Sequence, residues 1–131
     1  MTLNVRVITP DKVVLDTDTE EIILPSSTGQ LGILTDHAAL LTSLDIGVIW
    51  LRTGTSWNSM VLMEGFAEVE NNKVTVLCNG AEESSSIDLT TAQADLEKAT
   101  LLVDEATNQK EKIKATVELR KCKARVQALT K

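Results

Sequence analysis

The sequence contains few of the side chains on which many binding sites depend. Tyrosine is absent, and the chain has one phenylalanine and two tryptophans among 131 residues. Aromatic platforms on which nucleic-acid bases stack are therefore missing, and the net charge of −6 also disfavours a polyanionic partner. We predict no nucleic-acid partner, and we expect a core built mainly from leucine, isoleucine, valine and alanine.

Histidine and cysteine are equally scarce. His37 is the only histidine, and Cys78 and Cys122 lie far apart and outside any CxxC pattern. One imidazole supplies too few ligands for a metal centre, and no GxSxG elbow or second histidine is present for nucleophilic catalysis. We interpret both cysteines as buried and reduced, and we predict no catalytic residue, no metal and no cofactor. The sequence favours a binding or mechanical part over an enzyme.

Long hydrophobic runs are also absent. No apolar stretch approaches the roughly 20 residues that span a bilayer, so we expect no direct membrane insertion. The first ten residues, MTLNVRVITP, contain neither an apolar signal core nor the arginine- and serine-rich character of a transit peptide. We expect a soluble chain that functions in the compartment where it is made.

Residues 1–86 have the pattern of short β-strands. Leu3, Val5 and Val7 alternate with polar residues, which is typical of a strand with one buried face. The segments FAEVE and KVTVLC flank Asn71-Asn72, and asparagine tolerates the left-handed conformation that a tight hairpin requires. Many such segments at close spacing predict a β-sandwich or barrel.

The hydrophobic period changes after Ser86. Two apolar stripes, with residues three or four positions apart, are joined by the polar stretch TNQ; they are Ala92, Leu96, Ala99, Val103 and Ala106, then Ala115, Leu119, Cys122, Val126 and Leu129. Thr90 and Gln93 fit a capping box at the start of the first helix. The predicted fold is therefore α+β: an N-terminal β-sandwich of two antiparallel sheets over residues 1–86, then an antiparallel helical hairpin over residues 87–131.

The charge is divided unequally between these two parts. Residues 1–86 carry a net charge of −8, whereas residues 87–131 carry +2. On the second helix, Lys110, Lys114, Lys121 and Arg125 fall within about 60° of one another. We call these four residues the basic strip. Because the apolar stripe holds the hairpin together, the cations should be free, either as a solvated face or as a docking strip for an acidic partner.

The stretch GQLGILTDHAALL, residues 29–41, contains His37 and two glycines. Gly29 and Gly32 do not match a nucleotide-binding loop, so we expect backbone that turns sharply or approaches a neighbour closely. His37 is best interpreted as a histidine hydrogen-bonded within a loop.

Three segments resemble a known family. EEIILPSSTGQLGILTDHAALLTSLDIGVI (residues 20–49), GFAEVENNKVTVLCNGAE (65–82) and ELRKCKARVQAL (118–129) are similar to the epsilon subunit of F-type ATP synthases, over the whole length of the chain. The pattern is most similar to the plastid and cyanobacterial branch. The family commonly has Leu-Pro-Asn-His-Ala-Pro where this chain has residues 34–39, LTDHAA, and Gly-Gly-Phe-Ala where it has residues 64–67, EGFA.

The resemblance implies a non-catalytic subunit in the central stalk of a proton-translocating ATP synthase. The sandwich would bind the gamma subunit and the loops of the c-ring, through a loop containing Gln30, Leu31, Gly32 and His37. The helical hairpin would be a regulatory arm that inhibits ATP hydrolysis, with the basic strip facing an acidic segment of the beta subunits. The chain would lie peripherally on the stromal side of the thylakoid membrane or on the cytoplasmic side of a cyanobacterial membrane.

Some members of that family bind ATP through Ile/Leu-Asp-x-x-Arg-Ala. The matching residues here are Ile87-Asp88-Leu89-Thr90-Thr91-Ala92, so Thr91 replaces the arginine and the phosphate-pairing guanidinium is missing. We predict weak or no ATP binding.

Two other interpretations compete with this one. The chain could be a free-standing adaptor whose coiled-coil hairpin recruits an unrelated partner, or a small-molecule-binding β-barrel with a helical lid. Co-purification with gamma and c subunits separates the first alternative from the main hypothesis, and a deep apolar pocket inside the sandwich would favour the second.

Overall fold

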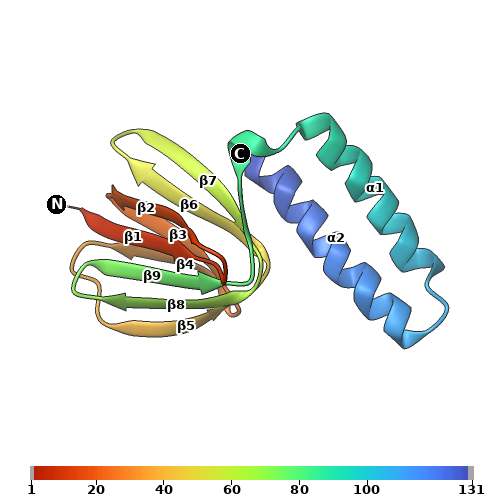
Figure 1. Cartoon of the computed structure of the whole chain (residues 1–131), viewed down its shortest axis with the longest axis horizontal. Helices are drawn as coiled ribbons and strands as arrows, with labels where there is room; N and C mark the ends of the chain where they lie inside the picture. Colours follow the sequence, from red (N-terminus) through yellow and green to blue (C-terminus); the bar gives the residue numbers. More distant parts are fainter. Residues whose placement is uncertain (1, 130–131) are drawn as a thin grey trace.

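The computed structural model describes residues 2–129, so Met1 and residues 130–131 of the two predicted domains lie outside it. Within the described part, strands are followed by two long helices (Figure 1). The strands are β1 (Leu3–Ile8), β2 (Val13–Thr19), β3 (Glu21–Ser26), β4 (Gly29–Leu34), β5 (Leu40–Leu44), β6 (Gly47–Thr53), β7 (Ser56–Leu62), β8 (Gly65–Glu70), β9 (Lys73–Cys78) and β10 (Ala81–Glu83). The 3-10 turn η1 (Ser84–Ser86) leads to α1 (Leu89–Glu105) and α2 (Gln109–Leu129).

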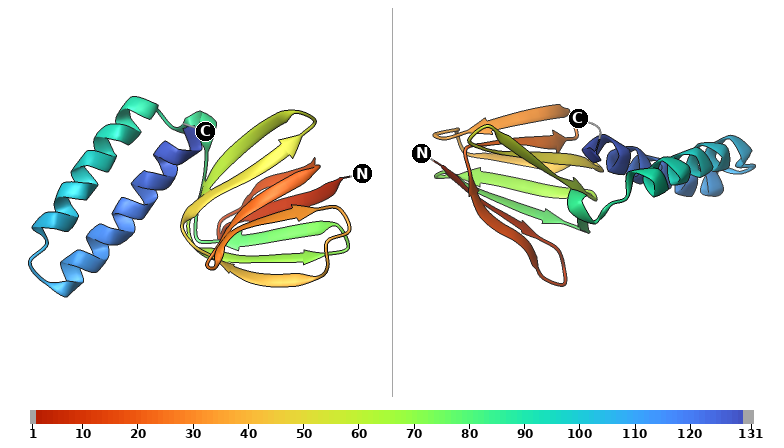
Figure 2. Two further views of the ribbon diagram at one scale, coloured as in Figure 1. Left: turned by 180° about the vertical axis from the view of Figure 1, so that it is seen from behind. Right: turned by 90° about the horizontal axis from the view of Figure 1, so that it is seen from above.

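The strands form one folded-over sheet. Its order is β10-β7-β6-β3-β5-β8-β9-β1-β2, and β4 pairs with β3 outside this path. Strands β3 and β5 share a single residue pair, Ser26 opposite Leu44, so the sheet bends over at this joint into two layers. Figures 1 and 2 show the layers facing each other, with the helices at one side. The predicted β-sandwich followed by a helical hairpin is confirmed.

The prediction of purely antiparallel sheets is wrong at one position. Strands β1 and β9 pair in parallel, with Val5 opposite Val74 and Val7 opposite Val76. No short turn joins these two strands, because β9 follows β1 only after seven intervening strands. A tight hairpin imposes an antiparallel direction, whereas such a distant pair is free to be parallel.

The core between the layers is aliphatic, as the composition predicts. Leu3, Val5 and Val7 are fully buried, so the alternation along β1 is confirmed. Isoleucine, leucine and valine from both layers, with Met60, Ala67 and Cys78, complete the cluster. Both cysteines are buried and reduced, as predicted. Aliphatic side chains fill much of the space between the layers, and a cavity of about 280 Å³ lies beside Leu15 of β2, Leu51 of β6 and Met60 of β7.

Two turns have the backbone geometry expected from their residues. Asn71 and Asn72 have φ angles of 51° and 61°, so both adopt the left-handed conformation in the β8–β9 hairpin. Gly29 has a φ of 126°, a backbone conformation that residues with a side chain rarely adopt. It lies at the end of the turn between β3 and β4. Gly29 therefore accounts for the predicted sharp turn.

The first helix begins earlier than its sequence suggests. Asp88, not Thr90, is the N-cap: its carboxylate accepts hydrogen bonds from the backbone N–H of Thr91 at 3.1 Å and from the Thr91 hydroxyl at 2.7 Å. The hydrogen bond from the Thr91 side chain is the main cause of a lowered pKa at Asp88, and the bond from the Thr91 backbone contributes as well. Both residues belong to the class that caps helices, and Asp88 prevails because it binds Thr91 twice.

The helices pack antiparallel along the two predicted stripes. Ala92, Ala99 and Cys122 are buried, and the other stripe residues are buried or half-buried. Residues 106–108 connect the helices, and the side chain of Asn108 accepts a hydrogen bond from the Glu111 backbone at 2.8 Å. The predicted helical hairpin is confirmed.

The two glycines of residues 29–41 give a matched test of this fold. Gly29→Ala should lower the free energy of unfolding by about 1–3 kcal/mol, because alanine is strained at that φ angle. Gly32→Ala should change it by less than about 0.5 kcal/mol, because no atom lies within 4 Å of a Cβ built there. Urea denaturation of both variants measures the difference. Equal losses at the two positions would contradict the assigned turn.

Candidate functional site

The second helix, α2, has two buried faces. The hydrophobic pattern predicted the face that packs on α1, but not the face that packs on the sandwich. Ala124 and Ala128 are buried against Val48, Trp50 and Val61 on the outer side of β6 and β7. The Ser59 hydroxyl donates a hydrogen bond to the backbone carbonyl of Ala128 at 3.0 Å. Only the C-terminal part of α2 rests on the sandwich, and the rest of the hairpin projects away (Figure 1). The spacing of two small residues, four positions apart, was the available signal for this second face.

An ion pair lies beside this contact. The Arg125 guanidinium donates two hydrogen bonds to the Glu82 carboxylate, from Nε to Oε1 and from Nη2 to Oε2, both at 2.8 Å. Strand β10 pairs with β7, which places Glu82 next to α2. Side-chain exposure is 23% for Arg125 and 32% for Glu82, so water screens the pair only in part. The Arg125 hydrogen bond is the main cause of a lowered pKa at Glu82, and the same bond raises the pKa of Arg125.

The basic strip therefore lies differently from the sequence prediction. At about 100° per residue, Lys110 projects in the same direction as Ala128, and Lys121 differs from it by about 20°. The strip thus occupies the face of α2 that rests on the sandwich. The expectation that all four cations are free is wrong for Arg125, because Glu82 binds it. Among residues 2–129, Lys110, Lys114 and Lys121 form no ion pair.

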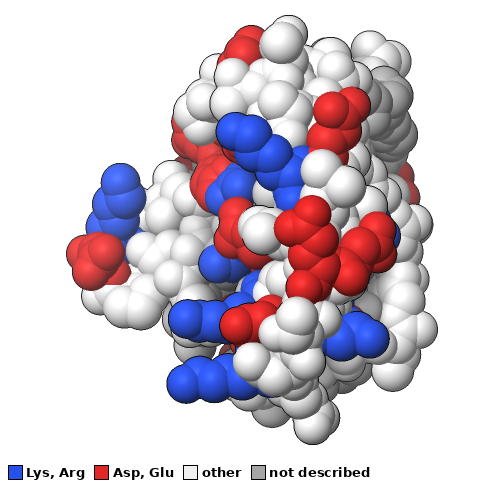
Figure 3. Space-filling model, turned by 90° about the vertical axis from the view of Figure 1, so that its right-hand side faces the viewer, with Lys and Arg blue, Asp and Glu red and all other residues white. Residues whose placement is uncertain are grey.

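The opposite side of the hairpin is mixed in charge. Seen from the side of the helices, acidic and basic side chains are interspersed (Figure 3). Neither positive nor negative charge dominates this view, so this side of the hairpin offers no extended basic surface to an acidic partner. The concentration of cations on α2 belongs to the face described above.

The segment predicted as one loop is divided by the structure. Gln30, Leu31 and Gly32 lie on the edge strand β4, not in a loop, and His37 lies beyond its other end. Gln30 and Leu34 are about 13 Å apart at a rise of about 3.3 Å per residue, so Gln30 and His37 lie toward opposite ends of β4. The prediction of a loop for residues 30–32 was wrong because β4 contains two glycines and a polar residue, a composition that is also typical of loops. Leu31 packs on the core, whereas Gln30 and Gly32 are exposed.

His37 orders the loop between β4 and β5. Its Nδ1 lies 2.7 Å from the carbonyl oxygen of Ala38, and its backbone N–H donates to the Leu34 carbonyl at 3.3 Å. The preceding residue, Asp36, has a φ of 65°, and its N–H donates to the Asn72 side chain at 2.6 Å. The loop is thereby fastened to the β8–β9 turn. Among the described residues, no group of three or more His, Cys, Asp or Glu side chains is placed to hold a metal.

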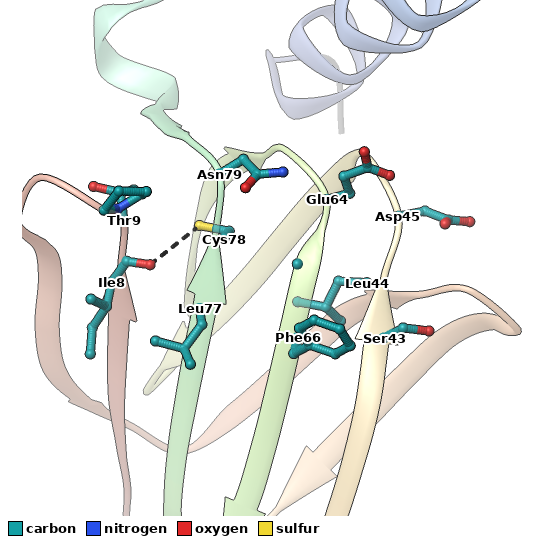
Figure 4. A pocket seen from close by; sticks show the side chains of 12 residues that line it. Ile8, Thr9, Ser43, Leu44, Asp45, Glu64, Phe66, Leu77, Cys78 and Asn79 are labelled. Atoms are coloured by element: carbon teal, nitrogen blue, oxygen red, sulfur yellow. Dashed lines mark hydrogen bonds between the residues drawn. The ribbon is translucent and has the colours of Figure 1, made fainter.

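A row of apolar side chains crosses the outer face of the layer formed by β5, β8, β9, β1 and β2. Ile8 pairs with Leu77 and Leu77 pairs with Phe66, so the three lie side by side on β1, β9 and β8 (Figure 4). Phe66, the only phenylalanine of the chain, is 58% exposed, and Leu77 is 52% exposed. They border a surface cavity of about 690 Å³. We call Ile8, Leu77 and Phe66 the apolar row. Sequence reasoning missed it, because a single phenylalanine is normally expected in the core.

Comparison with known proteins accounts for both parts of this architecture. The family "ATP synthase, Delta/Epsilon chain, beta-sandwich domain" matches residues 2–84, and "ATP synthase, Delta/Epsilon chain, long alpha-helix domain" matches residues 85–130. The chain belongs to the ATP synthase delta/epsilon family.

Within this family the chain is of the epsilon type found in chloroplasts and cyanobacteria. It is 74% identical to the ATP synthase epsilon chain, chloroplastic, of Emiliania huxleyi over 129 residues, which are 98% of this chain and 99% of that one. It is 59% identical to the corresponding chain of Pyropia yezoensis, covering 99% and 97% of the two chains. Identity to the ATP synthase epsilon chain of Prochloron didemni is 53%, covering 98% and 96%. As an epsilon-type chain it is a non-catalytic part of ATP synthase.

Solved structures share the fold at low identity. A chain in the cryo-EM structure of the Euglena gracilis mitochondrial ATP synthase has a TM-score of 0.86 at 20% identity, with 98% of this chain and 81% of that chain covered. A chain in the Tetrahymena thermophila structure described as central stalk/c-ring has a TM-score of 0.66 at 19% identity, with 99% and 98% covered. Neither described helix of this epsilon-type chain is long and apolar enough to cross a membrane.

Near the start of α1, the epsilon-type chain has a small cavity that Arg125 shares with three carboxylates. The cavity has a volume of about 290 Å³, and Glu82, Asp88 and Asp95 line it. The Thr91 hydroxyl is occupied by Asp88, and Arg125 is occupied by Glu82. A polyphosphate would meet more negative than positive charge there. Weak or no ATP binding stays a prediction, now with a second physical reason beyond the missing arginine.

The contact between α2 and the sandwich should loosen in acid. Because Glu82 has a lowered pKa in the folded chain, its contribution to docking is present above the ordinary glutamate pKa. The contribution is lost as the pH falls through the lowered value. Trp50 is buried under α2, so its fluorescence should shift to longer wavelength in that range. Glu82→Gln should lack this transition, and an identical acid transition in both chains would contradict the assignment.

Proposed function

We propose that the chain is the central-stalk subunit that couples rotation between the gamma subunit and the c-ring, and that its helical arm inhibits ATP hydrolysis. The observation that carries the proposal is the division of the molecule into a sandwich with exposed apolar residues and a hairpin that contacts it only through the C-terminal part of α2. In such a molecule the sandwich can attach to neighbouring subunits while the hairpin moves, and neither role requires a catalytic residue. Gamma, the c-ring loops and an acidic segment of the beta subunits are the proposed partners.

The apolar row is the proposed surface for gamma. Soluble chains rarely leave large apolar side chains together on a sheet face, and such a patch commonly marks a protein interface. Phe66 and Leu77 each expose more than half of their surface, and Leu41 on the neighbouring strand β5 is 71% exposed. His37 belongs to the same layer, since its loop is fastened to the β8–β9 turn. We therefore propose that His37 lies in the same layer as the gamma-facing surface, at the opposite end of β8 and β9 from Phe66 and Leu77.

Gln30, Leu31 and Gly32 are proposed to face the c-ring. They lie on β4, the edge strand that pairs with β3. There Gln30 is polar and exposed, and Gly32 is small and exposed. Polar c-ring loops fit a polar strand edge with open space around Gly32 better than they fit the apolar row. The four residues predicted as one contact would then serve two neighbours. The chain would lie peripherally on the thylakoid membrane, stromal side, or on the cyanobacterial membrane, cytoplasmic side.

The helical arm supports regulation because only the C-terminal part of α2 contacts the sandwich (Figure 1). Ala124 and Ala128 each bury about one methyl group, worth about 0.8 kcal/mol. The contact also covers Val48, Trp50 and Val61, and it includes the hydrogen bond from Ser59 and the ion pair with Glu82. A contact confined to one end of the hairpin suits an arm that leaves the sandwich when another surface binds it more tightly. The adaptor and lidded-barrel alternatives do not account for the similarity to epsilon chains over nearly the whole length.

Truncation after Ser86 tests the role of the arm. The remaining chain should still assemble with gamma, because the sandwich core lies within residues 3–78. It should restrain ATP hydrolysis less than the full chain when added to an epsilon-depleted complex. ATPase activity at saturating amounts of each chain is the measurement. Equal inhibition by the two chains would refute the regulatory assignment.

The apolar row has a matched test. Phe66→Ala should weaken gamma binding about tenfold or more, as loss of a central aromatic anchor does. Leu101 on α1 is also 58% exposed, so Leu101→Ala removes a comparably exposed side chain outside the row and should change affinity less than about twofold. Affinity for isolated gamma is measured by surface plasmon resonance, with urea denaturation of each variant as the folding control. Equal effects of the two substitutions would remove the apolar row from the interface.

A further inference from the structure

The sandwich contains a carboxylate, Glu82, that binds one cation of the basic strip. Glu82 binds Arg125 with the two-bond geometry that a guanidinium forms with a partner's carboxylate. Glu118 adds a weaker contact to Arg125, at 3.8 Å from Nη1. The electrostatic influence of Lys121 also lowers the pKa of Glu82, so a second strip residue lies close enough to favour the same anion.

The geometry of α2 makes the two occupations exclusive. The buried residues Ala124 and Ala128 and the cations Lys121 and Arg125 share one face of the helix, within about 100°. An acidic segment that binds Lys121 and Arg125 from this side must lie where β7 and β10 lie in the docked chain. Arg125 therefore cannot bind Glu82 and a partner's carboxylate on this face at once.

The distal half of this face is uncovered. Val117 and Ile113 continue the direction of Ala124 and Ala128 toward the hairpin connection, and they are 39% and 58% exposed. Lys110 and Lys114 lie beside them and form no ion pair among the described residues. Continuity with the covered half and the positive charge favour an acidic, amphipathic segment of a protein partner as the occupant.

We propose that Glu82 is an internal competitor, which holds α2 on the sandwich until an acidic partner takes Arg125 from it. The partner first contacts Lys110 and Lys114, which are accessible in the docked state. It then extends along the face toward Lys121 and Arg125 and displaces Glu82. This inference rests on the proposed function for the identity of the partner, whereas the competition itself belongs to the isolated chain.

The first experiment measures docking in the isolated full chain. Acrylamide quenching of Trp50, in a Trp57→Phe background, reports whether α2 covers it. Glu82→Gln should raise the undocked population about tenfold, since one charge-assisted pair is lost. Glu83→Gln is the matched control, because Glu83 is adjacent and exposed and its carboxylate forms no ion pair among residues 2–129. Equal quenching of the two variants would overturn the competitor role of Glu82.

The second experiment measures the competition. A synthetic glutamate-rich helical peptide serves as the acidic probe. Glu82→Gln should bind it about tenfold more tightly than Glu83→Gln does. The exchange Glu82→Arg with Arg125→Glu should restore docking but bind the peptide less tightly than the wild type. Undocking without a gain in peptide affinity would overturn the competition.

Inhibition of an epsilon-depleted complex is measured in parallel. Glu82→Gln should inhibit ATP hydrolysis at about tenfold lower concentration than the wild type does. If no chain inhibits while quenching and peptide binding behave as expected, the proposed function fails and the competition stands. If the variants inhibit equally although docking differs, the competition is not part of regulation and the inference is wrong in the complex.

Discussion

The double burial of β6 and β7 is the constraint on which the arrangement of the molecule depends. Along β6, Ile49 and Leu51 enter the sandwich core, and Val48 and Trp50 lie under α2. On β7, Met60 and Leu62 face inward while Val61 faces the helix. These two strands therefore connect both parts of the chain. A change in either face would affect the seating of the hairpin as well as the sandwich.

This constraint also explains why the hairpin is held at one end. The small side chains Ala124 and Ala128 let α2 approach the strands closely, but they bury little apolar surface. The charged contact with Glu82 supplies direction as well as affinity, because a guanidinium and a carboxylate bind in a fixed fork geometry. The remainder of the arm is supported by the other helix alone. A specific contact at one end of the hairpin fits the two positions that we propose for the arm.

Much of the fold could be predicted from local pattern. Alternation along β1, the Asn71-Asn72 turn and the two helical stripes each depend on neighbouring residues, and the structure has all three. The parallel pairing of β1 with β9 could not be predicted this way, because it joins strands distant in sequence. The resemblance to the family implied that Gln30 and His37 share one loop, whereas Gln30 lies on β4 and His37 lies beyond the end of that strand. The exposure of Phe66 and the engagement of Arg125 depend on tertiary contacts that no sequence period encodes.

The central claim is that α2 is docked on the sandwich in the free chain and leaves it in the inhibited enzyme. Spin labels at the exposed positions Thr55 and Lys123, with both native cysteines replaced by serine, report the separation of β6–β7 from α2. Pulsed electron–electron double resonance should give a short, narrow distance distribution for the free chain. In the assembled complex, inhibited for ATP hydrolysis, the distribution should move to longer distances. The short distribution persisting in the fully inhibited complex would contradict the account.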